Sequence, residues 1–225
     1  MSLREKGSVP TREPSRIEAL YSTRSIVIKR LLDYLLGVPL LLLALPVMAL
    51  IACSIKLVDR GPVLYVQERE GYRGRTIRLF KFRTMYVDSE ERLQDFFLAH
   101  PESEAKWRTL FKLEEDPRII PYIGEALRRS SLDELPNLWN LVRGDLTLVG
   151  PRPFPLYHVT EFASEFRALR QSVRPGLTGL WQIERGDIDA QCRWDTYYIE
   201  HWSLFLDLQI LARTVMVMVK GKAYY

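Results

Sequence analysis

The sequence predicts an α+β protein that is mainly helical and carries one membrane-embedded helix near its N-terminus. Three observations lead to this class. An apolar run of 22 residues, 34–55, contains no charged side chain. Two short strand-like runs follow at 63–67 and 76–83, and the stretches 157–171 and 204–219 are amphipathic or apolar at helical spacing. With 225 residues, the chain is long enough to bury a hydrophobic core.

Composition narrows the classes of function. The chain has 32 Lys+Arg and 28 Asp+Glu, a net charge of +4, but no basic stripe interleaved with aromatic residues, so nucleic acid is not an expected partner. The basic residues gather instead around the apolar run and in the motifs, as anionic lipid head groups and phosphates require. Cys53 lies inside the apolar run and far from Cys192, which argues against a disulfide framework and favours a cytosol-facing domain.

The N-terminal part divides into a polar arm, residues 1–24, and a membrane segment, residues 25–58. Lys29, Arg30 and Asp33 lead directly into the apolar run. At about 1.5 Å per residue, the run is long enough to cross a hydrocarbon core of about 30 Å. Length alone therefore favours a spanning helix.

Two features favour a helix that enters the membrane and returns. Both flanks are basic, since Lys56 and Arg60 follow the run, and a spanning helix would send one basic flank outward. Pro46, near the middle, cannot donate to the Leu42 carbonyl and should bend the helix. The preceding flank carries seven Lys/Arg, at positions 4, 6, 12, 16, 24, 29 and 30.

The two strand-like runs predict a short β-hairpin. Glycines 71 and 74 provide its turn. Alternation shifts phase at Phe80 and Phe82, as a β-bulge would produce, and this directs Lys81 and Arg83 to one side. A solvated strand face would show the same two basic residues.

The segment 127–153 holds the candidate reactive groups. Asp133 and Glu134 follow the basic pair Arg128–Arg129. Ser131 and Glu134 stand at capping-box spacing, which predicts a helix with both carboxylates in its first turn, where free N–H groups suit phosphate. An ordinary helix cap and solvated ion pairs would fit this spacing equally well. Arg152 lies between two prolines, which fix its backbone for a two-point grip on phosphate.

Five blocks together carry a resemblance to a known family. They are K-R-L-L-D at 29–33, K-F-R-T-M at 81–85, S-L-D-E-L-P-N at 131–137, G-D-L-T-L-V-G-P-R-P at 144–153 and R-P-G-L-T-G-L-W-Q at 174–182. In this order they resemble the bacterial sugar transferases, the monotopic polyprenyl-phosphate phosphoglycosyl transferases. The resemblance covers residues 29–225. It implies a re-entrant hairpin broken at a Ser-Pro pair, whereas this chain has Leu45-Pro46.

The resemblance implies a reaction at the cytoplasmic face of the bacterial inner membrane. A sugar 1-phosphate would pass from a UDP-sugar to undecaprenyl phosphate, releasing UMP, as the first membrane step of exopolysaccharide, O-antigen or capsule assembly. Asp133 would be the nucleophile of a ping-pong reaction, and Glu134 would contact Mg²⁺, with Mn²⁺ as the alternative. The catalytic domain would span residues 59–225 and include amphipathic helices at the membrane interface. Its phosphate- and substrate-binding residues would be Lys81, Arg83, Arg128, Arg129, Arg152, Arg174 and Gln182.

Two other readings use the same residues. A Mg²⁺-dependent membrane phosphatase or hydrolase would employ the carboxylates to release free sugar phosphate, and a non-enzymatic scaffold would use the motif only as a helix cap. Other enzymes of glycan assembly are possible partners. The W-Q loop and the segment 192–202 resemble hexose-1-phosphate transferases, for galactose or glucose, more than those for diamino sugars.

Overall fold

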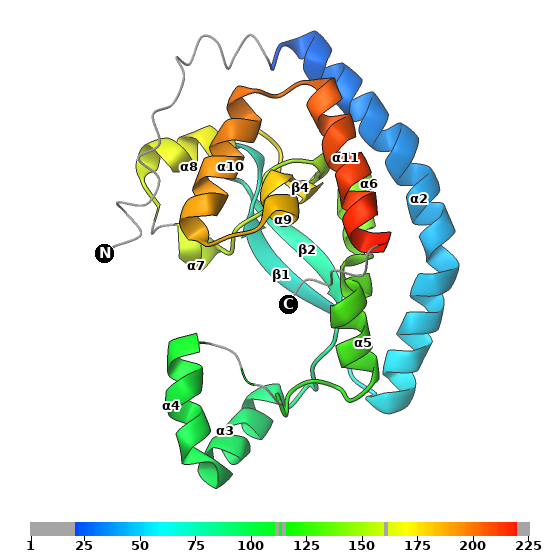
Figure 1. Cartoon of the computed structure of the whole chain (residues 1–225). Coiled ribbons are helices and arrows are strands. Elements are labelled where there is room, and N and C mark those ends of the chain that lie inside the picture. The colour runs from blue at the N-terminus through cyan, green and yellow to red at the C-terminus, as the bar shows by residue number, and fades with distance from the viewer. Residues whose placement is uncertain (1–20, 111–112, 114–115, 160–161, 220–225) are drawn as a thin grey trace. The chain divides into compact units, whose positions relative to one another are not determined.

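The computed structural model describes residues 21–110, 113, 116–159 and 162–219 (Figure 1). These residues form a mainly helical protein with two two-stranded sheets, which confirms the predicted α+β class. Of the polar arm predicted at residues 1–24, only residues 21–24 fall within the described part.

Helix α2 (Thr23–Val58) is the predicted membrane segment. It is long and apolar enough to cross a bilayer. Its 36 residues, including Pro39 and Pro46, belong to one helix, and the bend expected at Pro46 stays a prediction. Much of its surface is exposed aliphatic side chain, for example Leu35, Leu43 and Leu50.

The chain forms two compact units. Among the described residues, the first contains 21–44, 66–80, 137–159 and 162–219, and the second contains 45–65, 81–110, 113 and 116–136. Helix α2 and the predicted β-hairpin, strands β1 (Leu64–Glu70) and β2 (Thr76–Phe82), contribute residues to both units. The short 3-10 turn η2 (Tyr72–Gly74) connects the two strands.

The first unit is built around a parallel pair of strands, β3 (Thr147–Val149) and β4 (Gly176–Thr178), which the sequence did not predict as a sheet. Helices α6 (Asn137–Arg143) and α11 (Leu204–Val219) lie against this pair, and α9 (Leu180–Glu184) packs on α11 (Figure 1). Helix α8 (Ser164–Gln171) packs on α10 (Ile188–Glu200), and the short α7 (Leu156–Val159) precedes it.

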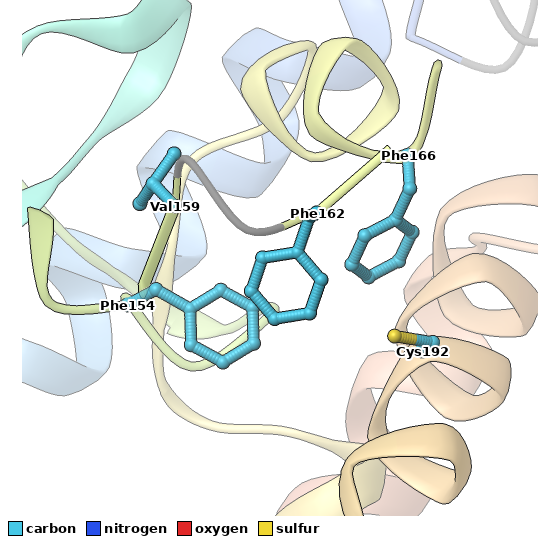
Figure 2. Packing of buried hydrophobic residues seen from close by; sticks show 5 residues of the cluster. All are labelled: Phe154, Val159, Phe162, Phe166 and Cys192. Carbon is cyan, nitrogen blue, oxygen red and sulfur yellow. The ribbon is translucent and has the colours of Figure 1, made fainter. Parts of the chain in front are cut away.

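Two apolar clusters belong to the core in the described part of this unit. Ile77 and Leu79 of β2 pack with Leu146 and Leu177. A second, aromatic cluster lies between α7, α8 and α10, and Figure 2 shows its rings facing one another. The aromatic cluster consists of Phe154, Val159, Phe162, Phe166 and Cys192.

Glycines permit the close approach of β3 and β4 at their ends. A Cβ on Gly176 would lie 2.1 Å from the main-chain nitrogen of Gly150, and a Cβ on Gly150 would lie 2.6 Å from the Arg174 carbonyl oxygen. No side chain fits at such distances, so both glycines of the G-P-R-P and R-P-G motifs are needed for this backbone contact.

The second unit contains α3 (Ser89–Ala99), α4 (Pro101–Leu110), α5 (Ile123–Ser130) and the 3-10 turn η3 (Leu132–Glu134). Helix α4 begins at Pro101. The core of the unit joins Ile55 of α2, Phe82 of β2 and Leu127 of α5.

Strand β2 runs from Thr76 to Phe82 as one strand. Its change of hydrophobic phase has a simple cause, because one face is buried at Ile77 and Leu79 and the other face is buried only at Phe82. Ile77 and Leu79 enter the core of the first unit, and Phe82 enters the core of the second. A bulge is not needed to explain the pattern.

Candidate active site

The two adjacent carboxylates lie on the turn η3 in the second unit. Helix α5 ends at Ser130, and Ser131 follows it in the left-handed conformation (φ 56°, ψ 19°). The Ser131 N–H donates to the Arg128 carbonyl, so this residue closes α5 instead of opening a new helix. Helix α6 begins only at Asn137.

The predicted capping box is therefore wrong. The Ser131 side chain caps nothing, and its main-chain carbonyl accepts from the Glu134 N–H at 3.2 Å. Because Ser131 has a positive φ, its side chain does not take the position of an N-cap residue, whose backbone is extended. Asp133 and Glu134 are thus held on a tight 3-10 turn and not in the first turn of an α-helix.

Lys81 provides the cation next to this pair. Its Nζ lies 2.7 Å from Oε1 of Glu134, and the two side chains are 18% and 29% exposed. The contact joins the end of β2 to η3, two segments 53 residues apart in sequence. It brings together three of the predicted functional residues, Lys81, Asp133 and Glu134, in one unit.

Asp133 is a half-buried carboxyl in a charged surrounding. Burial raises its pKa above the ordinary value, and the neighbouring Glu134 raises it further. The positive charges of Lys81 and Arg128 act in the opposite direction and lower the pKa. The balance leaves a carboxyl that water solvates poorly while two cations stabilise its ionised form.

The two arginines of the basic pair have different environments. Arg128 donates from Nε to Oγ1 of the buried Thr84 at 3.0 Å and affects the pKa of Asp133. Arg129 instead lies 3.7 Å from Glu125 on the surface, where both side chains are more than half exposed. An exposed pair of this kind contributes little. The geometry therefore favours Arg128 as part of the site.

Arg83 has a structural position. Its side chain is 7% exposed and forms an ion pair with Asp59. It also donates to the main-chain carbonyls of Asp59, Pro62 and Met85. These bonds fix the chain that follows α2. The predicted phosphate-binding role does not fit a guanidinium whose donors are engaged in this way.

The residues predicted to flank the membrane segment make specific bonds to β3 in the first unit. Arg30 donates to the Leu146 carbonyl at 3.0 Å. Asp33, 2% exposed, accepts from the Thr147 hydroxyl and from the Leu148 N–H at 2.9 Å. Lys29 donates to the Val149 carbonyl, to Tyr198 and to Asp207. No motif predicted that Tyr198 and Asp207 belong to this network.

The remaining predicted binding residues also lie in the first unit. The Arg174 guanidinium is half-buried, 4.9 Å from the centre of the Tyr72 ring, and burial together with Arg30 lowers its pKa. The Gln182 amide nitrogen donates to the Leu177 carbonyl at 3.1 Å. Among the residues that the structure describes, Oε1 of Gln182 and Nε1 of Trp181 are buried without a hydrogen-bond partner, as groups awaiting a polar ligand would be.

The carboxylates also define where a divalent cation would fit. In the described ranges there is no group of three or more His, Cys, Asp or Glu side chains able to hold a metal ion. Mg²⁺ commonly uses one or two carboxylates together with waters and substrate phosphates. Asp133 and Glu134 fit that limited donor set.

Comparison with known proteins places these features in a family. The family model described as bacterial sugar transferase matches residues 24–221. The exopolysaccharide production protein ExoY of Sinorhizobium fredii is 38% identical over 200 residues, which cover 88% of each chain. The undecaprenyl-phosphate galactose phosphotransferase of Salmonella typhimurium is 35% identical over 201 residues, 88% of this chain and 42% of that protein. The UDP-glucose:undecaprenyl-phosphate glucose-1-phosphate transferase of Klebsiella pneumoniae is 34% identical over 211 residues, again 42% of its length.

Proposed function

This chain belongs to the bacterial sugar transferase family, and we propose on that premise that it transfers a sugar 1-phosphate from a UDP-sugar to undecaprenyl phosphate. The observation that carries the proposal is the half-buried Asp133 beside the Lys81–Glu134 ion pair. Relatives named for galactose and glucose phosphate transfer to undecaprenyl phosphate support the same substrates.

In the proposed first step, a carboxylate oxygen of Asp133 attacks the phosphorus that bears the sugar. The bond from this phosphorus to the bridging oxygen breaks, and UMP leaves with that oxygen. The product is an aspartyl phosphosugar. In the second step, a phosphate oxygen of the lipid attacks the same phosphorus and releases the Asp133 carboxylate. The lipid then carries a diphosphate sugar.

The surrounding charges suit this sequence of steps. A carboxylate approaching a diphosphate meets like charge, and Lys81 and Arg128 offset that repulsion. Glu134 would hold Mg²⁺, which would neutralise the diphosphate of the donor. Because Asp133 is poorly solvated, its ionised form loses little hydration when it attacks.

We also propose that both ends of α2 lie on the cytoplasmic side of the inner membrane. Near its N-terminal end, Lys29, Arg30 and Asp33 are bonded to residues of the first unit. Near its C-terminal end, Ile55 is fully buried in the core of the second unit. A helix that crossed the bilayer would place one of these polar or packed ends on the far side. The exposed leucines would then face lipid along a re-entrant or surface-lying path.

A single assay tests the proposed reaction. Purified protein in nanodiscs is given UDP-galactose or UDP-glucose, with and without undecaprenyl phosphate, and release of UMP is measured. We expect release that depends on the lipid and moves the sugar phosphate to the organic phase, with Asp133→Asn inactive. Water-soluble sugar phosphate formed without lipid would show a hydrolase instead. No release from any UDP-sugar, by protein that is folded, would leave the scaffold reading.

A further inference from the structure

The main chain of the Pro151-Arg152-Pro153 segment is held through its carbonyl groups. Each of the four carbonyls from 151 to 154 accepts a hydrogen bond. The donors are, in order, the N–H of Gly176, the guanidinium groups of Arg170 and Arg69, and the N–H of Glu70. Pro151 and Pro153 have no N–H, so carbonyls are the main-chain groups by which these two residues can be bound.

Arg170 is fixed independently of this segment. It projects from α8 and forms an ion pair with Asp195 of α10, and both side chains are less than 10% exposed. Its guanidinium carbon lies 4.0 Å from the centre of the Phe154 ring and 5.7 Å from that of Phe166. Figure 2 shows these two rings within the aromatic cluster. Burial lowers the pKa of Arg170 to about 10, so the group is charged at neutral pH.

Arg170 therefore acts as a rigid link between the core and one atom of the backbone. An ion pair with Asp195 and stacking on Phe154 would be sufficient to hold the side chain. The additional donation from Nη2 reaches the carbonyl of Arg152, the residue expected to bind phosphate. Since Arg152 precedes a proline, its backbone is already restricted to extended conformations. The bond to its carbonyl fixes the orientation of its peptide group.

We propose that Arg170 is a positioning residue, which sets the direction of the Arg152 side chain by holding the Arg152 carbonyl. The inference rests on the proposed function and on the expectation, from the sequence, that Arg152 binds a phosphate of the substrate. Arg170→Lys preserves the charge and can still pair with Asp195. The lysine ammonium cannot, in addition, replace the planar guanidinium, which stacks on Phe154 and at the same time donates to the Arg152 carbonyl.

A double-mutant cycle between Arg170 and Arg152 tests the link. We measure kcat and KM for UMP release with Arg170→Lys, Arg152→Lys and the double variant. We expect Arg170→Lys to lower kcat/KM about tenfold or more in the wild-type background, and less than about twofold once Arg152 is already lysine. Independent losses that multiply in the double variant would overturn the positioning role. Wild-type kinetics for Arg152→Lys would overturn the phosphate role itself and the inference with it.

Two controls separate positioning from loss of structure. Arg167→Lys makes the same substitution in the same helix, but the Arg167 side chain is 42% exposed and pairs with Glu70. We expect the kcat/KM of this variant to equal that of the wild type. Cys192→Ala removes a buried group from the aromatic cluster and should lower the melting temperature without a comparable loss of kcat/KM. If Arg170→Lys does not fold, the neutral pair Arg170→Gln/Asp195→Asn takes its place in the cycle, with the same expected non-additivity.

Discussion

Replacing Lys81 by methionine removes the cation beside the carboxylate pair while keeping most of the side-chain volume. The structure gives the size of the effect. At 2.7 Å the Coulomb attraction between Lys81 and Glu134 is roughly 6 kcal/mol for an effective dielectric constant of about 20. Desolvation and the partial exposure of both groups reduce this to the net value of a charge-assisted bond, about 1.5–3 kcal/mol.

If the Lys81 charge stabilises the transition state by the same amount, its removal lowers kcat/KM by about 10- to 100-fold. The pH dependence should change as well. Lys81 lowers the pKa of Asp133, so its removal raises that pKa. Because the nucleophile must be ionised, the acid limb of the kcat/KM profile should move to higher pH, and the loss should be larger at pH 6 than at pH 8.

The assay is UMP release from a UDP-sugar in nanodiscs that contain undecaprenyl phosphate, measured between pH 5.5 and 9. Lys81→Arg is the matched control, since it keeps the charge and should leave the acid limb in place. A Lys81→Met protein with wild-type kcat/KM at every pH would refute the electrostatic argument. A uniform loss with an unmoved acid limb would refute the coupling to Asp133.

Three further predictions follow from the same structure. Asp133→Asn should abolish turnover and yet raise the melting temperature at pH 7.5, because burial disfavours the ionised carboxylate. The gain in melting temperature should shrink as the pH falls through the raised pKa of Asp133, and a variant less stable than wild type at pH 7.5 would contradict this. Gly124→Ala should destabilise the protein by about 1–3 kcal/mol, since a Cβ there would lie 2.4 Å from the Thr84 carbonyl oxygen; differential scanning fluorimetry should show a fall of about 2–4 °C per kcal/mol. Single cysteines at Ser8 and Ser89, in a background without Cys53 and Cys192, should both resist an impermeant thiol reagent on intact cells, and labelling at Ser8 would establish that α2 spans the membrane.

The elements that could be predicted were those with a local signal. The uncharged run of α2 and the hairpin of β1 and β2 both appear in the sequence as composition or turn residues. Strands β3 and β4 have three residues each and pair in parallel across a long connection, so no local period identifies them. The left-handed Ser131 likewise depends on where α5 ends, which the capping-box spacing alone does not reveal.

The site was predicted in part. The family resemblance predicted one function for Lys81, Asp133 and Glu134. In the structure they lie together because the fold joins β2 to η3. The sequence pattern gives no indication of the ion pair between Arg83 and Asp59, and the phosphate-binding role of Arg83 stays a prediction. Arg170 was missed for a similar reason. Its contacts to Asp195 and to the Arg152 carbonyl connect residues 25 and 18 positions away, and no motif spacing encodes them.

The bonds between the start of α2 and β3 bear on how this protein can be produced and studied. Asp33 is the acceptor for the Thr147 hydroxyl and the Leu148 N–H, which are themselves buried. A soluble fragment that begins after α2, for instance at residue 59, would leave both donors without this acceptor. Loss of a hydrogen bond to a charged group costs about 1.5–3 kcal/mol, a large share of the stability of a small domain. Expression, crystallisation or screening with such a fragment would therefore examine a weakened first unit, and the anchor helix has to be retained as an integral part of the enzyme.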